Sequence, residues 1–577
     1  MQLLKTAIST GLLLAMPLLT EAASKTVSAS DHWQVSSVTQ LDSLIIEKGS
    51  KVTAPEGFDL TLTVNGNSVP LKPGNYSGKV TLTPTRSYLV KYRFYEPYHY
   101  RAGLLVHNDQ VVHDQSVFAA LGDPDISDVS ASNLSIRSQE ENFNGVIVSG
   151  DSTYTLNNVD IDFTGNGGND FAGWGAGIMS TDTATVIVNN AKIKTIGAVR
   201  TALFIGGKST MIVNDADIEV QNGKLPDDYQ FSIAPGEMLE VPYGLGLSGN
   251  VRATNLIDEA TVYYNDCHIK ANGWGALSSD GDGPSRMFVN RCVIDVTDSG
   301  YGAYANGDSH DYISHSVINV PDVGVIVGGP GWVTLTDESV INSEKLGVMM
   351  HQGAGGSVLR VEKGSQINSK NSAVQIKGRG GDVIVDNAIL NPLNGVLVQA
   401  MENDDPIMKD MAKNGPPPPP PGSEAMPPPD MPGASAMNFS PDVNVTFRNT
   451  KLTGDVLHAM SELGNMNVYL QSATLEGAIS TSVTFPTSGQ EPTKETYRTV
   501  GEVSNQLQKS TSKHKLKVFV DHDATWHVSK TSYIDALTIA EGAVIKASTG
   551  KLLFKVNGKQ RPLTPGHYTG DIEIGPK

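Results

Sequence analysis

Between Gly275 and Gln399 the sequence repeats a short phrase in which small or apolar residues alternate with larger side chains. The phrase begins with a tiny residue and returns about every 23 to 27 residues, as GALSSD, GAYANG, GVIVGG, GVMMHQ, AVQIKG and GVLVQA. A period of two is typical of a β-strand with one face turned inward, and a regular return is typical of a solenoid. The pattern therefore predicts one such strand in each coil of a repeat structure.

A second phrase ends in an aliphatic residue and accompanies the first. Most successive copies of that aliphatic residue lie 23 to 26 residues apart, in segments such as LNNVDI, VNNAKI, VNDADI, YNDCHI and VNRCVI. One turn of a parallel β-helix has this length, and it stacks like residues about 4.8 Å apart. We therefore predict internal ladders of aliphatic residues, and ladders of asparagine at the bends.

The two ends of the chain carry related segments, at 31–84 and 523–576. Trp33 matches Trp526, and VNGNSVPLKPGNYSG from Val64 matches VNGKQRPLTPGHYTG from Val556. A solenoid exposes backbone groups and apolar core at each end, so we expect the duplicated segments to be modules that cover these ends.

Two long gaps interrupt the repeat. The gap between Ile218 and Ile269 predicts a loop, and the gap between Leu390 and Leu452 contains a proline-rich run that cannot pair in a sheet. The expected organisation is a signal peptide at 1–23, an N-terminal β module and connection at 24–124, coils at 125–400, a Pro/Met-rich excursion or lid at 401–440, last coils at 441–510, and a C-terminal module at 511–577 that duplicates 31–84.

Composition limits the compartments in which the protein is expected to reside and the partners that it is expected to bind. The chain has 577 residues, and 43 basic against 61 acidic side chains give a net charge of −18, which argues against nucleic acid as a partner. The N-terminus has a basic residue, a short apolar run and small residues, which is typical of a secretory signal. We therefore expect a periplasmic or secreted protein with no transmembrane segment after signal removal. Cys267 and Cys292 occupy the same place in consecutive repeats, so the sequence allows a disulfide or two stacked buried thiols.

These features together resemble secreted right-handed parallel β-helix proteins, a class that includes pectate-lyase-like enzymes and autotransporter passenger domains. The resemblance covers roughly residues 125–475 and implies an all-β, right-handed parallel β-helix solenoid with duplicated terminal β modules. Pectin-hydrolysing members carry Asp-Asp, Gly-His-Gly and Arg-Ile-Lys motifs. Here Asp280-Gly-Asp282 and Gln375-Ile376-Lys377 are distant echoes, and Gly-His-Gly is absent. The chain also departs from autotransporters, because we expect no outer-membrane barrel.

The outward positions of the first phrase define the candidate site. A histidine can act as general base near neutral pH, and a neighbouring lysine or arginine can stabilise a developing anion. We predict catalytic roles for His351, Lys377, Tyr304 and Arg379. The predicted substrate-binding residues along the same strip and its loops are Phe204, Leu277, Asn306, Met349, Gln399 and His310.

Three acidic residues lie beside the strip, and the sequence leaves open whether they bind a metal ion. Asp280, Asp282 and Asp308 could bind Ca²⁺ through oxygen ligands, serve as paired carboxylates, or be solvated turn residues; the chain otherwise predicts no cofactor. Two functions follow. The first is an extracytoplasmic enzyme acting on a carbohydrate or similar extended substrate, as a lyase by β-elimination or as a hydrolase. The second is a non-catalytic surface, adhesion or ligand-binding protein.

Overall fold

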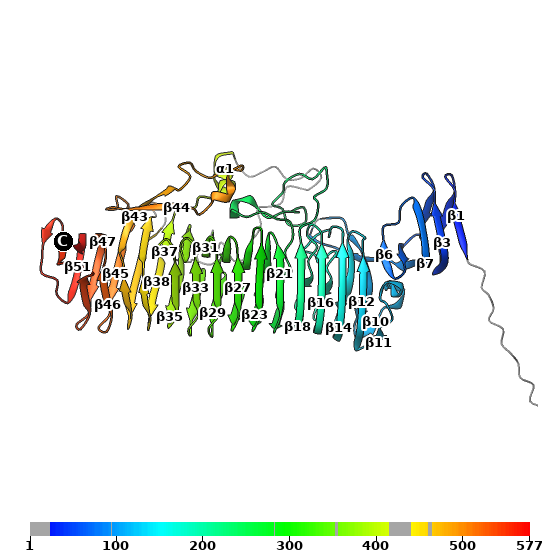
Figure 1. Cartoon of the computed structure of the whole chain (residues 1–577), viewed down its shortest axis with the longest axis horizontal. Helices are drawn as coiled ribbons and strands as arrows, with labels where there is room; N and C mark the ends of the chain where they lie inside the picture. Colours follow the sequence, from blue (N-terminus) through cyan, green and yellow to red (C-terminus); the bar gives the residue numbers. More distant parts are fainter. Residues whose placement is uncertain (1–22, 94, 282, 352–355, 415–439, 460–463) are drawn as a thin grey trace, which may run out of the picture.

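The computed structural model describes residues 23–93, 95–281, 283–351, 356–414, 440–459 and 464–577. These residues form a parallel β-helix, which confirms the predicted fold, and the coils follow one another along a rod with an end module at each extremity (Figure 1). The predicted signal peptide, apart from Ala23, and residues 415–439 of the predicted excursion lie outside the described residues.

Sheet I contains the repeated first phrase, one strand per coil. Its neighbours pair in parallel along the rod from β9 to β43, and β44 closes the row as an antiparallel partner. Its strands are β9 (Tyr98–His107), β13 (Phe143–Ser149), β15 (Ile178–Ser180), β17 (Leu203–Ile205), β19 (Thr254–Leu256), β22 (Gly275–Asp280), β25 (Tyr301–Asn306), β28 (Val323–Gly328), β31 (Leu346–His351), β34 (Val374–Lys377), β37 (Val396–Met401), β40 (Asp455–Ala459), β43 (Ile479–Pro486) and β44 (Val503–Leu507).

Sheet II contains the second phrase and bends in the middle of each coil. The bend falls at a residue with positive φ, such as Asn158, Asn190 or Asp215. Three long strands cross the bend unbroken, β14 (Thr153–Thr164), β16 (Thr185–Ile196) and β18 (Thr210–Gln221). Later coils have one strand on each side of it, and those on the first side are β20 (Thr261–Asn265), β23 (Arg286–Asn290), β26 (His310–Ser314), β29 (Trp332–Thr336), β32 (Val358–Glu362), β35 (Gly381–Asp386), β38 (Val443–Arg448), β41 (Met466–Gln471) and β45 (Leu516–Val520).

The second side of the bend carries the aliphatic ladder that the sequence predicts. Ile193, Ile218 and Ile269 are register partners on successive coils, and each is almost fully buried. The strands on this side are β21 (His268–Asn272), β24 (Val293–Thr297), β27 (Val317–Val320), β30 (Val340–Ser343), β33 (Gln366–Ser369), β36 (Ile389–Pro392), β39 (Lys451–Thr453) and β42 (Thr474–Glu476).

An asparagine ladder runs beside the bend. The Asn189 amide donates to the Asn157 carbonyl oxygen at 2.9 Å, Asn214 donates to Asn189 at 2.9 Å, and Asn265 donates to Asn214 at 3.0 Å. Each amide therefore satisfies its neighbour one coil away, at the place where the tight turn interrupts the backbone ladder.

The two end modules share their pairing as well as their sequence. In the first, β3 (Thr39–Ile46) pairs with β7 (Gly74–Arg86) and has a register shift between Leu41 and Ser43. In the second, β47 (Ser532–Ile539) pairs with β51 (Gly566–Pro576) and has its shift between Ile534 and Ala536. The remaining module strands are β1 (Ser24–Val27), β2 (His32–Gln34), β4 (Lys51–Thr53), β5 (Phe58–Val64), β6 (Asn67–Val69), β46 (Thr525–Val528), β48 (Val544–Ala547), β49 (Leu552–Val556) and β50 (Lys559–Gln560).

The modules dock on the coils through opposite sides. The first pairs β6 with β12 (Ser130–Ser138) of the first coil, and the second pairs β46 with β42 and β47 with β45 of the last coils. As a consequence Trp526 is fully buried and donates its indole N–H to the Gly477 carbonyl oxygen at 3.0 Å. Its counterpart Trp33 is half-buried, and Lys25 places its ammonium 4.5 Å from the indole ring.

Cys267 and Cys292 stack on neighbouring coils, as their positions in the repeat predict. Both are buried free thiols, and the backbone N–H of Cys267 donates to the Cys292 Sγ at 3.4 Å. Of the two alternatives that the sequence leaves open, the structure contains the pair of thiols.

Candidate functional site

The outward face of sheet I is covered by other parts of the chain along most of its length. Met179 and Phe204, which are register partners, lie under the segment around β8 (Tyr88–Val90) and its neighbour Tyr98. Ile326 and Met349, also register partners, lie under the loop that contains Met238. The sequence pattern correctly shows an apolar outward column here, and the cover explains why it is stable in water.

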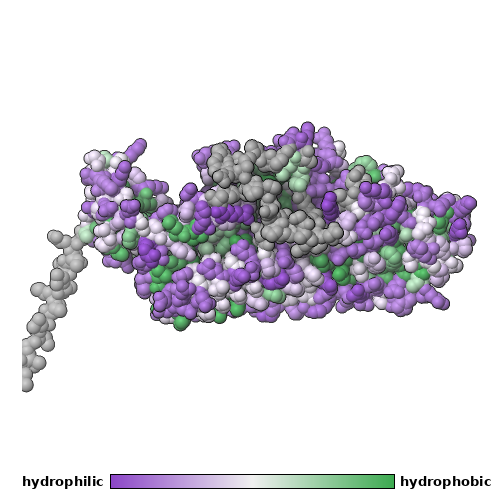
Figure 2. Space-filling view, turned by 180° about the vertical axis from the view of Figure 1, so that it is seen from behind, coloured by the Kyte–Doolittle hydropathy of each residue, from purple (hydrophilic) through white to green (hydrophobic). Residues whose placement is uncertain are grey.

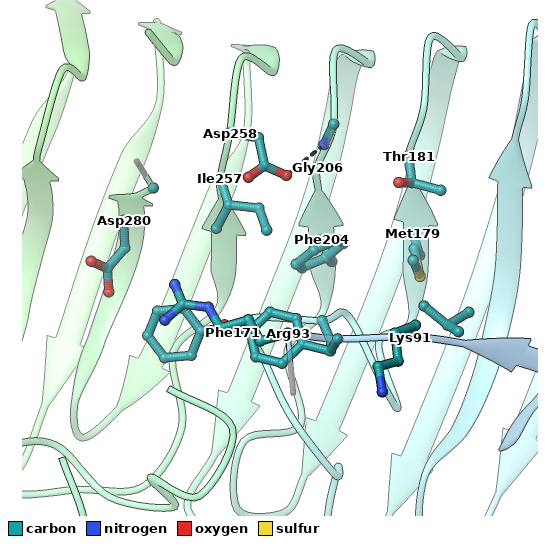
Figure 3. Close-up of a pocket in the computed structure, with 15 residues that line it drawn as sticks. Lys91, Arg93, Phe171, Met179, Thr181, Phe204, Gly206, Ile257, Asp258 and Asp280 are labelled. Carbon is teal, nitrogen blue, oxygen red and sulfur yellow. Dashed lines mark hydrogen bonds between the residues drawn. The ribbon is translucent and has the colours of Figure 1, made fainter. Parts of the chain in front are cut away.

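Two adjoining cavities remain between these covers. The larger has a volume of about 300 Å³, and Met179, Phe204 and Ile257 line it from sheet I and the turn after β19, while Lys91 and Arg93 line it from the crossing segment (Figure 3). The smaller has a volume of about 220 Å³ and is lined by Arg93, Phe171, Pro235, Met238, Pro242, Leu245, Trp274, Asp280, Gly281, Tyr301, Tyr304 and Asn306. Because Arg93, Phe171, Asp280 and Gly281 line both, the two cavities form one groove that crosses successive coils.

Asp280 lies between the two cavities, and the buried side chain of Arg252 holds it in place. The buried guanidinium of Arg252 donates to Asp280 Oδ2 at 2.8 Å and to Asp170 Oδ2 at 2.6 Å. The rings of Phe171 and Trp274 lie 4.6 and 4.7 Å from that guanidinium, on a cation that has no access to solvent. Arginine suits this place because its planar charge stacks on rings and donates two ways at once.

The charges of Asp170 and Arg252 act together with Asp280, and they keep Asp280 paired with the guanidinium of Arg252. Burial raises the pKa of Asp170, and the Arg252 charge opposes that rise. Burial acts against the charge of Arg252, but the carboxylates of Asp170 and Asp280 together raise its pKa. The second oxygen of Asp280 accepts the amide of Asn306 at 3.1 Å. Asp280 thus faces the groove in a fixed orientation.

Tyr304 is a half-buried ring at the wall of the smaller cavity. Its centroid lies 5.4 Å from that of Tyr301. Burial raises the pKa of Tyr304 well above its ordinary value, and the Asp280 carboxylate adds to the rise. The phenol is therefore protonated in neutral solution and can donate a hydrogen bond.

His351 and Lys377 are direct register partners on β31 and β34, as the repeat predicts. Each meets an acidic residue from the segment between β37 and α1 (Pro406–Asn414). His351 Nε2 lies 3.4 Å from Asp405 Oδ2, and Lys377 Nζ lies 2.6 Å from Asp404 Oδ1. Both basic side chains are buried, so these two residues form a covered cluster with Asp404 and Asp405.

A further segment secures the same cover. The backbone N–H of Gly501 donates to Asp404 Oδ2 at 2.7 Å, and its carbonyl oxygen accepts the amide of Gln375 at 3.0 Å. Burial raises the pKa of Asp404, but the Lys377 charge and these hydrogen bonds outweigh burial and lower it. Gln399 is fully buried and donates to Asn505 Oδ1 at 2.7 Å.

The structure gathers only part of the predicted site at the groove. Phe204, Tyr304, Asn306 and Asp280 line it. Met349 and Gln399 lie under the cover, beside the His351 and Lys377 cluster rather than in a cavity. Asp282 lies outside the described residues.

Leu277 is a core residue, which corrects its predicted outward direction. The sequence phrase aligns Gly275 with Gly302, but the hydrogen-bond register pairs Gly275 with Tyr301 and Leu277 with Ala303. A slip of one residue exchanges the two faces of a strand. Ser278 consequently points outward, and its hydroxyl lies 2.6 Å from the Tyr301 hydroxyl.

The remaining predicted residues lie elsewhere. His310 is on the outward face of sheet II, where its ring stacks on Trp332 at 5.2 Å and its Nε2 lies 3.7 Å from Asp308 Oδ1. Arg379 is exposed in the turn after β34. Asp308 is exposed in the turn after β25, whereas Asp280 lines the groove. In the described part of the chain, the three potential ligands near enough to share an ion are Asp521, His522 and Asp523, at an exposed turn.

Sequence reasoning misses the groove residues that come from outside the repeat. Lys91, Arg93 and Phe171 enter from crossing segments with no periodic signal, and Arg252 comes from a coil interrupted by the long loop. The one available signal is the pair of Gly-Trp-Gly segments at Trp174 and Trp274, which lie next to these positions.

Comparisons with protein-family models, with curated proteins and with solved structures gave no match. The fold defines the chain as a parallel β-helix protein. None of the helices within the described ranges has the length and apolar character needed to span a membrane.

Proposed function

We propose that the protein is an extracytoplasmic β-helix protein that binds a carbohydrate or similar extended ligand in the groove over β15 to β25. The observation that carries this proposal is the joined pair of cavities, in which apolar and aromatic walls alternate with Asp280, Asn306 and Arg93. Aromatic rings pack against the apolar faces of sugar rings, and planar polar side chains take their hydroxyls. The groove crosses successive coils, so a chain-like ligand fits it better than a compact one.

Hydrolysis is the first catalytic candidate for this groove. Asp258 and Asp280 both line the larger cavity. Most glycoside hydrolases use two carboxyl groups, one on each side of the glycosidic bond that is cleaved. Asp258 accepts the backbone N–H of Gly207 at 3.0 Å and is exposed at the rim, whereas Asp280 is fixed by Arg252. In this proposal Asp280 is the carboxyl group of fixed position and Asp258 is the carboxyl group open to solvent.

β-Elimination at His351 and Lys377 is the second candidate. Their direct pairing favours it, because a base beside a cation suits proton abstraction next to a carboxylate. Both side chains are engaged by Asp405 and Asp404 under the cover, so this chemistry requires the segment before α1 to move away first.

A binding screen tests whether the groove holds a glycan. The purified protein is tested on a glycan panel, and the best ligand is titrated against wild type, Tyr304→Ala and Asn306→Ala. Both substitutions should weaken binding about tenfold, because each removes one contact worth roughly 1 to 2 kcal/mol. Lys270→Ala, on the outward face of β21, is the matched control and should bind like wild type.

Turnover assays on the same ligand distinguish the reactions. Release of reducing ends that Asp258→Asn and Asp280→Asn abolish would indicate hydrolysis. Formation of unsaturated products that His351→Ala abolishes would indicate elimination. Binding without either product leaves the non-catalytic function, and no binding of any glycan would contradict the proposal.

A further inference from the structure

The outward face of sheet II carries an apolar stripe that is separate from the groove. It lies on the first side of the bend, and consecutive members are register partners on neighbouring strands from β14 to β45. We call it the outer stripe; its members are Thr155, Ile187, Ile212, Tyr263, Phe288, Tyr312, Thr334, Arg360, Ile384, Thr446, Tyr469 and Phe519.

The outer stripe differs from the rest of the outward surface of sheet II. Tyr263 is 37% exposed, and its ring stacks on Phe288 with centroids 4.8 Å apart. Within the described ranges no segment covers this side, whereas sheet I has a cover. The second side of the bend is polar at the same coils, with Lys192 and Asp217 as outward register partners. Figure 2, seen from the side opposite to that of Figure 1, shows a largely hydrophilic surface with small hydrophobic patches.

We propose that two copies of the chain associate through the outer stripe, antiparallel and face to face, about a two-fold axis that passes through β29. The argument rests on self-complementarity, which an isologous interface requires. An axis along β29 places each coil of one copy opposite the coil equally far on the other side of β29. The facing pairs within the stripe are Ile187 with Phe519, Ile212 with Tyr469, Tyr263 with Thr446, Phe288 with Ile384, and Tyr312 with Arg360.

Each of these pairs is favourable by chemistry. An aliphatic residue meets an aromatic one in three pairs, and in another the Tyr263 ring meets the methyl group of Thr446. In the fifth pair a guanidinium meets a tyrosine ring, a contact of the cation–π kind. At the axis itself Trp332, half-buried on the outward face of β29, faces its own copy as an aromatic pair, and its indole N–H donates to the hydroxyl of the buried Thr334 at 3.1 Å. The stripe therefore brings together different and complementary residues from its two halves.

The columns that flank the outer stripe agree with the same axis. Arg286 on β23 faces Asp382 on β35, and the two-fold axis forms this pair twice. Asn290 faces Asp386, and Asn265 faces Arg448. Opposite charges therefore meet, and no two like charges face each other at these positions.

The parallel alternative is unfavourable. A two-fold axis along the rod would place each coil against its own copy, so Arg360 would face Arg360. Two desolvated guanidinium groups without an acidic partner repel each other. This contact selects the antiparallel arrangement.

The size of the stripe is sufficient for a stable interface. Eleven paired coils at about 4.8 Å and three columns across the strands give a footprint on the order of 700 Å² per copy. Specific interfaces bury about 800 Å² per partner. The groove on sheet I faces another direction, so the dimer leaves it free to bind ligand.

Light scattering coupled to size exclusion tests the proposal on the purified full chain. The wild type should have the mass of a dimer. Arg286→Asp should weaken association at least tenfold, because it places two carboxylates against each other, and Arg286→Asp with Asp382→Arg should restore the dimer. Lys270→Asp, on the second side of the bend, should leave the mass unchanged.

A cross-link tests the axis independently. Trp332→Cys places one thiol from each copy beside the other, and mild oxidation with diamide should join the two chains. Cys267 and Cys292 are buried and serve as the internal control in wild type. A wild-type monomer at every attainable concentration would overturn the proposal, and so would a dimer that Arg286→Asp leaves intact or that Trp332→Cys cannot join. Thermal unfolding of each variant verifies that it is folded.

Discussion

Lys377 and Asp404 form an ion pair in which Nζ lies 2.6 Å from Oδ1 and neither side chain has appreciable access to solvent. A buried pair contributes little by itself, because desolvation offsets the attraction, but removing one partner leaves an uncompensated charge. Asp404→Ala should therefore lower the free energy of unfolding by about 3 kcal/mol. The double variant Lys377→Met with Asp404→Leu should recover most of that loss, as measured by denaturant titration.

The same pair shows where sequence reasoning about the site stops. The repeat correctly places His351 beside Lys377, because register partners follow from the spacing of the phrase. Asp404 and Asp405 stand at the start of the proline-rich excursion, and nothing local indicates that they return to sheet I. Contacts between a repeat and its insertions depend on the path of the insertion, which has no period.

The fold could be predicted from the sequence because the coils, unlike the insertions, repeat with a regular period. Ile269 and Ile294 stack because a fixed coil length and an apolar requirement act together at each repeat. The phrase alone does not determine parity at its edges, and Leu277 shows this. A one-residue difference in the turn before β22 changes its register, although the small residues look the same in sequence.

The duplicated tryptophans should differ in their contribution to stability. Trp526 is fully buried under the last coil and donates to Gly477, whereas Trp33 is only half-buried beside Lys25. Trp526→Ala should cost about 3 to 5 kcal/mol of unfolding free energy. Trp33→Ala should cost about 1 to 2 kcal/mol, since less of its surface leaves water on folding. Equal losses would show that the two modules are packed alike.

The stacked cysteines should behave as inaccessible thiols. Cys267 and Cys292 have exposed fractions of 3% and 1%, and a thiol must reach solvent to react. A maleimide reagent should label neither residue in the folded chain and both after unfolding in denaturant, as counted by intact mass. An unlabelled unfolded chain, two hydrogens lighter, would instead reveal a disulfide.

Asp311 should make stability depend on pH. It lies inside the solenoid with no exposed surface, where the hydroxyl of Ser279 donates to its Oδ1 at 2.7 Å. Burial raises its pKa to about 8, although the Ser279 hydrogen bond opposes the rise. The unfolded chain has an aspartate pKa of about 3.9. Below about pH 4 both states hold the proton and the full stability is present.

Between these two pKa values the unfolded state releases its proton while the folded state keeps it, so stability falls as the pH rises toward 8. Asp311→Asn keeps the shape and the acceptor for Ser279 but removes the titration. It should raise the free energy of unfolding at pH 7 by about 3 kcal/mol and flatten its dependence on pH. Asp217→Asn, exposed on the second side of the bend, is the control and should leave the pH profile of the wild type. Denaturant titrations from pH 5 to 9 measure both, and parallel profiles for Asp311→Asn and wild type would show that Asp311 is ionised in the core.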